Sequence, residues 1–439
     1  MKKVLFIAYY FPPMGGSGVQ RSLKFVKYMQ DFGYLPVVVT VNPLFTRWIK
    51  DKSMLPEIPH NVPIYRTFTL DINWIYKVLW GLRLNRVVQW IQLNWVLPDS
   101  EVTWICFAKK TINKIMKEHI IDLAYITAPP FSAMLLGPYL EKRFNIKYLV
   151  DFRDEWSNNP YRNDSGMGAR AKSKELFMEE EVLNNCTGIV YTHPQYMKEN
   201  FEGRYPFLKN KKNRTISNGF DESDFAHADS RQKTRNAKLT IVYIGTFYGR
   251  RQPECLWDAI YNLIECGKID SDKIEIRIIG RNTKSFVLGQ YTNYNEINKI
   301  VRVMSNKPYA EALAELMKSD MLMLFIAPGD NSRAEIPGKL FEYIRTYKPV
   351  FAIVPPDGVA AEILQKSKTG INCDSSNAKD VEKCFLELYQ NWLSNNLSVM
   401  PDKEYIAGYN RQYLTKELVS LFDEMLAEDT DKYKSKIPN

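Results

Sequence analysis

Residues 336–343 (IPGKLFEY) carry an ammonium group and a carboxylate three positions apart. Pro337 and Gly338 predict a turn, so that Lys339 lies at the start of a helix. An ammonium group beside the free N–H groups of a helix start is suited to binding a diphosphate. Glu342, one helical turn further on, can accept hydrogen bonds from ribose hydroxyls or pair with Lys339. The segment therefore predicts either a nucleotide site or a surface ion pair.

A glycine-rich loop, residues 11–18 (FPPMGGSG), follows the first apolar run of the chain. Glycine lets a backbone approach a ligand closely, and the start of the next helix offers free N–H groups to an anion. The dinucleotide fingerprint GxGxxG is incomplete, because Arg21 occupies the third glycine position and no acidic residue ends the next strand. The loop predicts an anion-binding turn or a tight strand-to-helix connection.

Two series of apolar runs are predicted to form the strands that position these groups. Residues 4–9 (VLFIAY) are continuously apolar, which is typical of a strand buried on both faces of a parallel sheet. Helical stretches separate successive runs, and this alternation predicts an α/β fold with doubly wound sheets. The first series comprises residues 4–9, 36–40, 123–127, 147–152 and 188–192, and the second comprises 239–245, 273–280, 321–326 and 349–354.

The two series are separated by a polar, basic break at residues 210–214 and a polar stretch at 226–237. We therefore expect two Rossmann-like domains, residues 1–215 and residues 216–403. The helical stretch at 404–428 has no strand of its own, and we expect it to pack back on the first domain.

Bulk composition limits the classes of protein. Of 439 residues, 45% are hydrophobic and 25% charged, as in an ordinary globular protein. The net charge of +9 favours anionic partners, or simply describes a mildly basic enzyme. The N-terminal apolar run lacks a cleavage site and is interpreted as a first strand, and no run reaches the roughly 18 apolar residues of a membrane span.

Metal and thiol chemistry have little support in the sequence. The six cysteines form no CxxC pair and the four histidines lie far apart, so we predict no metal site. We interpret the cysteines as reduced core residues of a cytosolic protein. Residues 270–272 (DSD) imitate the DxD motif of metal-dependent transferases, but they lie between a helix and a strand and are interpreted as a polar connection. The cysteines are at positions 106, 186, 255, 266, 373 and 384.

An ordered set of motifs along nearly the whole chain resembles the family-4 glycosyltransferases, which are retaining enzymes of GT-B fold. Capsule, O-antigen and exopolysaccharide transferases of that family are most similar. The resemblance implies two facing Rossmann-like domains with a cleft between them. The motifs are Gly15-Gly16, residues 127–130 (TAPP), 151–156 (DFRDEW), 216–221 (ISNGFD), 243–247 (YIGTF) and 336–343.

The resemblance implies a donor site. Glu342 matches the second glutamate of the family's E-x7-E motif, which binds the nucleotide ribose. The first position is Ala334, with Glu335 beside it, which puts the usual recognition of the donor sugar in doubt. Thr246 replaces a second basic residue that often follows the glycine, and Lys339 or Arg250 is expected to supply that charge. The donor-side residues carried over are Gly15, Gly16, Gly245, Arg250, Arg251, Glu335, Lys339 and Glu342.

The resemblance also places acceptor-side groups around Asp151, where Arg153 occupies a position that is often histidine in the family. Asp154 is expected to contact an acceptor hydroxyl and Arg153 an anionic group, or both belong to a salt-bridged strand end. The implied mechanism is retention, in which the departing diphosphate oxygen helps to deprotonate the acceptor. Basic groups that stabilise the charge growing on the diphosphate can act without a metal.

Residues 72–98 contain no acidic residue, three cations and four of the nine tryptophans. This pattern is typical of an amphipathic helix at a membrane interface, or of a buried helical hairpin that lines the acceptor site. We expect peripheral binding to anionic lipid through this segment.

The sequence thus predicts a cytoplasmic enzyme on the inner face of the membrane. It is expected to move a sugar from a nucleotide sugar to a saccharide acceptor, polyprenyl-diphosphate-linked, in cell-surface polysaccharide synthesis. No cofactor, metal or nucleic acid is expected. The alternatives are a GT-B sugar-nucleotide epimerase, for which no pair of proton-abstracting carboxylates is found, and a non-catalytic nucleotide- or lipid-binding protein.

Overall fold

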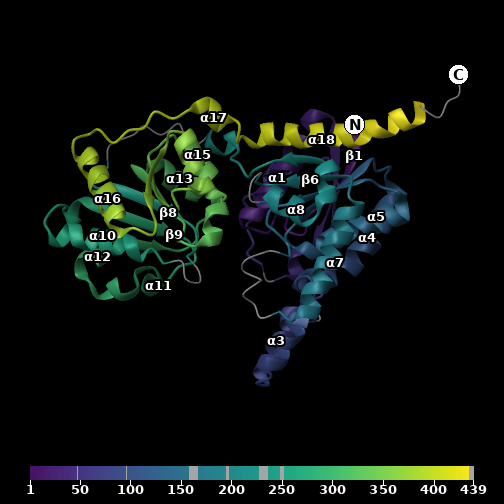
Figure 1. Ribbon diagram of the computed structural model, residues 1–439, viewed down its shortest axis with the longest axis horizontal. Helices are drawn as coiled ribbons and strands as arrows, with labels where there is room; N and C mark the ends of the chain where they lie inside the picture. The colour runs from purple at the N-terminus through teal and green to yellow at the C-terminus, as the bar shows by residue number, and fades with distance from the viewer. Residues whose placement is uncertain are drawn as a thin grey trace. The chain divides into compact units, whose positions relative to one another are not determined.

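The computed structural model (Figure 1) describes residues 1–434 apart from 47, 95, 158–166, 194–196, 227–235 and 248–251. The chain divides into two compact units. The first comprises Met1–Asn218 with Arg411–Asn439, and the second comprises Gly219–Asn410. The sequence places the domain boundary between residues 215 and 216, and the structural units meet between residues 218 and 219.

The first unit contains a seven-stranded sheet in the order β3-β2-β1-β4-β5-β6-β7, and every adjacent pair of strands is parallel. The order reverses between β1 and β4. Ligands of open α/β sheets bind outside the carboxyl ends of the strands at such a switch point. The strands are β1 (Lys2–Ile7), β2 (Tyr34–Val41), β3 (Ile64–Thr67), β4 (Leu123–Ala128), β5 (Tyr148–Phe152), β6 (Gly188–Tyr191) and β7 (Lys212–Thr215).

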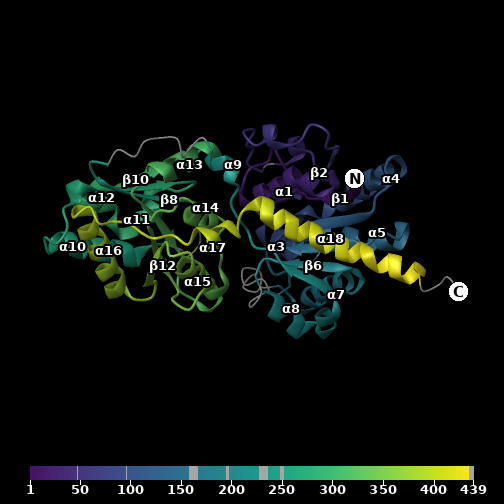
Figure 2. The ribbon, with the colours of Figure 1, turned by 90° about the horizontal axis from the view of Figure 1, so that it is seen from above.

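Helices cover both faces of this sheet because successive side chains of its strands point to opposite sides. Leu5 and Ile7 of β1 belong to one core cluster, and Val4 and Phe6 belong to the other. Helix α18 packs on α1 over the second face, where it contributes Phe422, and Figure 2 shows α18 lying across this unit. The helices are α1 (Ser17–Tyr28), α4 (Trp104–Glu118), α5 (Leu136–Phe144), α7 (Ala169–Asn185), α8 (Glu199–Arg204) and α18 (Arg411–Lys434).

The second unit repeats this plan with six parallel strands in the order β10-β9-β8-β11-β12-β13, and its switch point lies between β8 and β11. Its strands are β8 (Leu239–Ile244), β9 (Ile274–Ile279), β10 (Val301–Met304), β11 (Met321–Phe325), β12 (Val350–Val354) and β13 (Gly370–Asp374). Its helices are α9 (Glu222–Phe225), α10 (Glu254–Glu265), α11 (Lys284–Leu288), α12 (Asn295–Ile300), α13 (Tyr309–Lys318), α14 (Lys339–Arg345), α15 (Val359–Lys366), α16 (Ala378–Leu393) and α17 (Lys403–Ala407).

All the apolar runs expected to be strands are strands, but the interpretation of residues 210–214 as a polar break was wrong. These residues overlap β7, an edge strand whose side chains are half-buried or exposed. Its charged side chains remain in contact with solvent, and Arg214 pairs with Glu424 of α18. The predicted helix at 404–428 is divided into α17, which belongs to the second unit, and α18, which belongs to the first.

Residues 72–98 form a hairpin of two helices, α2 (Ile72–Gly81) and α3 (Asn85–Asn94). Arg83 in the connecting turn has a φ of 60°. Figure 1 shows α3 projecting from the body of its unit near one end of α7. Within the described part of the chain, no helix combines the length and the apolar character needed to cross a membrane.

The cysteines are all free, but the expectation that they are core residues holds only in part. Cys186 and Cys373 are buried and Cys255 and Cys384 are half-buried. Cys106 and Cys266 are exposed. The expectation fails for this last pair because both residues lie at solvent-facing positions, in α4 and directly after α10.

Candidate functional site

The glycine turn of the second unit follows β8 directly. Gly245 has a φ of 144°, and its N–H donates to the Ile279 carbonyl over 2.8 Å. The Asn282 side chain donates to the Gly245 carbonyl over 2.8 Å. A Cβ atom at Gly280 would lie 2.2 Å from the Gly245 oxygen, so glycine is required there too. The carboxyl ends of β8 and β9 are therefore fixed against each other at this turn.

Lys339 reaches this turn from the start of α14. Its Nζ atom lies 3.5 Å from the centroid of the Tyr243 ring, and that ring is stacked on Phe247 at 4.3 Å. A Cβ atom at Gly245 would lie only 2.9 Å from Lys339 Nζ. Gly245 thus makes room for the ammonium, and the aromatic face attracts it. Two donor-side residues predicted from distant motifs are neighbours in the structure.

Glu342 lies one turn further along α14 and is half-buried. The Tyr309 hydroxyl donates to Glu342 Oε1 over 2.9 Å. The next residue, Tyr343, is fully buried, and its hydroxyl oxygen accepts the Ile244 N–H over 2.9 Å. These bonds hold α14 at the carboxyl end of β8, so the ammonium and the carboxylate both lie at the edge of the sheet where ligands bind.

The structure shows less about the remaining donor-side residues. Glu335 is half-buried in the segment before α14, and its N–H donates to the Ser332 carbonyl. Arg250 and Arg251 lie outside the described residues. Arg281 was missed by the sequence analysis, although it directly follows the glycine that ends β9. It is exposed, and its backbone N–H donates to Thr246 Oγ1 over 3.3 Å, which places the backbone of this residue beside the glycine turn.

In the first unit, the glycine loop after β1 is hydrogen-bonded to residues 48–51. The Gly15 N–H donates to the Ile49 carbonyl over 2.8 Å, and Trp48 Nε1 donates to the Gly15 carbonyl over 2.7 Å. A Cβ atom at Gly15 would lie 3.2 Å from Asp51 Cβ. Gly16, with a φ of 107°, then caps α1. The loop lies where β1 meets α1, as the sequence predicts.

Arg153 follows β5 and links this loop to the segment where β4 ends, just before the 3-10 helix η5 (Phe131–Leu135). Its guanidinium donates to the carbonyls of Gly18 (2.8 Å), Ala128 (3.0 Å) and Pro129. A Cβ atom at Gly18 would lie 2.3 Å from Arg153 Nη1. Because backbone carbonyls engage all three guanidinium nitrogens, the geometry favours a positioning role for Arg153 over binding of an anionic group.

The two aspartates beside Arg153 differ in surroundings. Asp154 is exposed and forms no hydrogen bond or ion pair with any described residue. Asp151 is fully buried, and its carboxylate accepts two hydrogen bonds from Arg21, each 2.8 Å long. Tyr125 and Thr127 donate to the same carboxylate. Asp154 is therefore the group available to a substrate, and Asp151 belongs to an internal network.

Two opposing effects act on the pKa of Asp151. Burial alone would raise the pKa of Asp151, but the charge and hydrogen bonds of Arg21 lower the pKa below its ordinary value. Arg21 also donates to the carbonyls of Ile216 and Ser217. The pair thus connects α1, β5 and the segment that follows β7.

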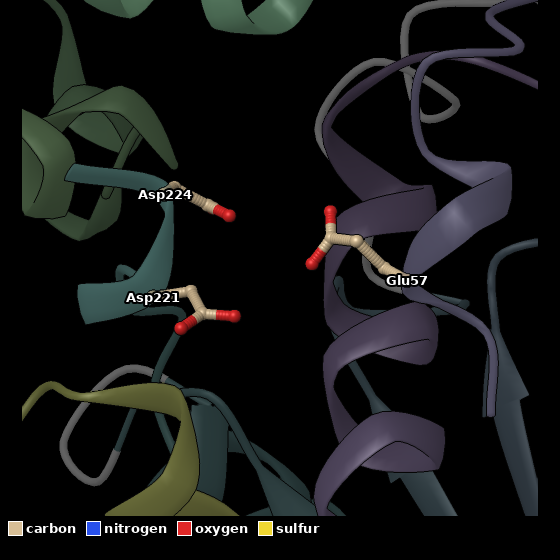
Figure 3. A group of neighbouring side chains, drawn as sticks. All are labelled: Glu57, Asp221 and Asp224. Atoms are coloured by element: carbon tan, nitrogen blue, oxygen red, sulfur yellow. The ribbon is translucent and has the colours of Figure 1, made fainter. Parts of the chain in front are cut away.

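Two of the three carboxylates shown in Figure 3, those of Glu57 and Asp221, have hydrogen-bond partners within their own units. Glu57, in the first unit, accepts hydrogen bonds from Lys24 (2.5 Å) and Lys27 (2.9 Å). Asp221, in the second unit, caps α9 by accepting from the N–H of Ser223 over 3.0 Å. We assign no metal ion to these residues.

No protein-family model and no curated protein sequence matches this chain, but solved structures do. Sucrose-phosphate synthase from Thermosynechococcus elongatus is 14% identical, with a TM-score of 0.63 over 98% of this chain and all of that one. The catalytic domain of starch synthase IV from Arabidopsis thaliana, bound to ADP and acarbose, is 9% identical, with a TM-score of 0.58 over 97% and 99%. A lipopolysaccharide outer core galactosyltransferase is 12% identical, with a TM-score of 0.54 over 96% and 99%.

These likenesses confirm the expected fold class. The chain consists of two Rossmann-like units with parallel sheets of seven and six strands, as in the GT-B glycosyltransferases.

Proposed function

We propose that this protein is a glycosyltransferase that moves a sugar from a nucleotide-sugar donor to a saccharide acceptor. The observation that carries the proposal is the grouping of Gly245, Lys339 and Glu342 at the carboxyl end of β8. Within a fold of the GT-B class, this edge offers a cation, a carboxylate and a backbone turn with no side chain in the way.

Each of these groups has a role in the proposed reaction. The Lys339 ammonium stabilises the negative charge that grows on the diphosphate as the glycosidic bond breaks. Glu342 accepts hydrogen bonds from the ribose hydroxyls. Arg281 supplies further positive charge where Thr246 replaces a basic residue. We propose retention of configuration and membership of family 4, on the strength of the ordered motifs.

On the acceptor side, the exposed carboxylate of Asp154 accepts a hydrogen bond from the acceptor hydroxyl, and Arg153 holds the glycine loop beside it. We further propose that the acceptor is lipid-linked and takes part in cell-surface polysaccharide synthesis at the inner face of the membrane.

The support for a membrane surface is the α2–α3 hairpin. Its turn and the flanking helix ends expose large apolar side chains, and the three cations Lys77, Arg83 and Arg86 are exposed beside them. Headgroup regions bind such mixtures of tryptophan and cations. The apolar side chains are Trp80 (48% exposed), Leu82 (64%), Leu84 (41%), Val87 (44%) and Trp90 (56%).

A panel of nucleotide sugars tests the proposed function. One donor is expected to raise the melting temperature, because a ligand that binds only the folded state stabilises it. The same donor is then incubated with saccharide and lipid-linked acceptors, and the products are separated by mass. A protein stabilised by a nucleotide sugar that transfers nothing and leaves it unhydrolysed would instead be a non-catalytic binding protein.

A further inference from the structure

A half-buried carboxyl group lies near the residues that follow the carboxyl end of β1. Glu101 belongs to η4 (Ser100–Thr103), and the Ser100 hydroxyl donates to its carboxylate over 2.9 Å. It interacts electrostatically with Tyr9 and Tyr10, which directly follow β1. The strand order of the sheet reverses between β1 and β4, and α/β proteins bind ligands outside the carboxyl ends of the strands at such a switch point.

The charges that act on this carboxyl group within the described part of the chain are acidic. Among the described residues Glu101 has no ion-pair partner, and the acidic side chains Asp71 and Asp99 lie near it. Desolvation first, and the charge of Asp99 second, raise the pKa of Glu101 to about 7. A carboxylate kept in such a place without a counter-ion is costly for the fold, which indicates a use for it.

An unpaired hydroxyl lies on the neighbouring turn. The Ser132 N–H donates to Asp99 over 3.0 Å, whereas the Ser132 hydroxyl is fully buried and has no hydrogen-bond partner among the described residues. Buried hydroxyl groups normally form hydrogen bonds, so this oxygen is expected to bond to a ligand group or to an ordered water.

An exposed aromatic side chain lies beside Tyr10. Tyr10 packs against Trp48 with ring centroids 4.7 Å apart, and Trp48 is 46% exposed. The bond from Trp48 Nε1 to the Gly15 carbonyl fixes the indole beside the glycine loop. Tyr10, on which the indole packs, also interacts with Glu101. A fixed, half-exposed indole and a carboxylate on either side of one tyrosine are suited to a sugar, because the ring packs on the C–H face of a pyranose while the carboxylate accepts from its hydroxyls.

We propose that Trp48 and Glu101 form the binding site for the acceptor sugar and that this sugar is uncharged. Glu101 accepts a hydrogen bond from a sugar hydroxyl, and the indole of Trp48 packs on the ring. A uronic acid is rejected here, because its carboxylate would lie beside Asp71, Asp99 and Glu101. The inference rests on the proposed transfer reaction and names its acceptor class.

Binding is then expected to depend on pH. The ionised form of Glu101 is the better acceptor, and it becomes populated as the pH rises through about 7. The groups that face Glu101 are Tyr9 and Tyr10 after β1, Asp71 before α2 and Asp99 before η4. Burial raises the pKa of both tyrosines, so neither changes charge in this range.

The test measures binding of p-nitrophenyl glycosides by saturation-transfer difference NMR between pH 5.5 and 8.5. We expect the wild type to bind a neutral hexoside, more tightly at the higher pH, and to bind the glucuronide at least about tenfold more weakly. Glu101→Gln is expected to weaken hexoside binding at pH 8 about tenfold and to abolish the pH dependence. Trp48→Ala weakens binding at every pH. Glu141→Gln, an exposed carboxylate on α5, is the matched control and behaves as the wild type.

Equal binding of hexoside and glucuronide, or unchanged binding and pH dependence in Glu101→Gln, overturns the inference. Failure of every neutral glycoside to bind a protein that still binds a nucleotide sugar also overturns it. The protein could also bind the hexoside through Glu101 and Trp48 but transfer no sugar. That result would support this binding site and contradict the proposed function.

Discussion

The ammonium of Lys339 lies against an aromatic ring, in space that only a glycine at position 245 leaves open. The side chain is thereby oriented before any ligand arrives, which lowers the entropy lost on binding. Glu342 is held similarly by the Tyr309 hydroxyl. At the scale of single residues, the donor-side prediction therefore concerns two side chains that the fold has already positioned.

Lys339→Ala and Glu342→Ala are each expected to weaken binding of the stabilising nucleotide sugar about tenfold or more, because each removes a charge-assisted contact of roughly 1.5–3 kcal/mol. Isothermal titration calorimetry measures the affinity, and circular dichroism confirms the fold. Lys366→Ala, which removes an exposed lysine of α15, is the control. Unchanged affinity and transfer rate in both variants would remove the proposed donor site.

Asp151→Asn is expected to destabilise the protein by about 3–5 kcal/mol, because it leaves the fully buried Arg21 guanidinium without its counter-charge. The pKa of Asp151 is lowered in the folded state, so its contribution is complete above the unfolded value of about 3.9. The contribution is lost as the pH falls through the lower folded value. Urea unfolding at several pH values measures both effects.

The difference between wild type and Asp151→Asn should accordingly shrink in acid. Asp31→Asn, at an exposed position, serves as the control and is expected to change stability by less than about 0.5 kcal/mol. A wild-type-like unfolding midpoint for Asp151→Asn at pH 7 would show that the pair contributes little.

At the scale of elements, edge strands were the hardest to predict. Strands β3, β7, β10 and β13 lack a long apolar run, and β7 reads KNRT. Strands inside a parallel sheet are covered on both faces and need apolar side chains throughout, whereas an edge strand is partly solvated. Whether such a segment forms a strand depends on backbone hydrogen bonds to the neighbouring strand, and the sequence pattern does not reveal that pairing.

The α2–α3 hairpin was expected either as an amphipathic helix on a membrane or as a buried hairpin. It is a hairpin with Tyr76 and Val88 buried and its turn exposed. Replacing Lys77, Arg83 and Arg86 by Glu is expected to release most of the protein from anionic liposomes, since each cation contributes about 1 kcal/mol near such a surface. Liposome flotation at low and high salt measures this.

The control variant replaces Lys172 and Lys174, two exposed lysines of α7 in the same unit, by Glu. Trp80→Ser together with Trp90→Ser should weaken the salt-resistant part of binding, which comes from apolar burial. If the wild type stays in solution with anionic lipid at low salt, the exposed hairpin has another partner and the membrane proposal is wrong.

At the scale of the whole molecule, the proposed chemistry relies on fixed positive charges to stabilise the leaving diphosphate. We therefore expect transfer to proceed at an unchanged rate, within about twofold, after treatment with EDTA, because Lys339 and the neighbouring cations take the place of a divalent ion. Initial rates with and without chelator measure this. Loss of turnover in EDTA that Mg²⁺ or Mn²⁺ restores would contradict it.

The sequence by itself determined the fold class and the start of the helix that carries Lys339. Long apolar runs such as residues 4–9 and 239–245 specify buried parallel strands regardless of what surrounds them, because hydrophobic burial on both faces is their only stable outcome. Pro337-Gly338-Lys339 similarly placed a lysine at the start of α14, since turn chemistry is local.

Only the tertiary structure decided which groups meet and which remain available. The sequence resemblance predicted that Arg153 binds an anionic group, but its guanidinium donates hydrogen bonds to backbone carbonyls at three other positions. It overlooked Glu101, whose raised pKa arises first from burial in the folded chain and then from the charge of Asp99, two residues earlier. The contact of Lys339 with the turn at Gly245 was likewise invisible. Desolvation and hydrogen-bond partners are set by segments distant in the chain, and they exist only after the sheets have assembled.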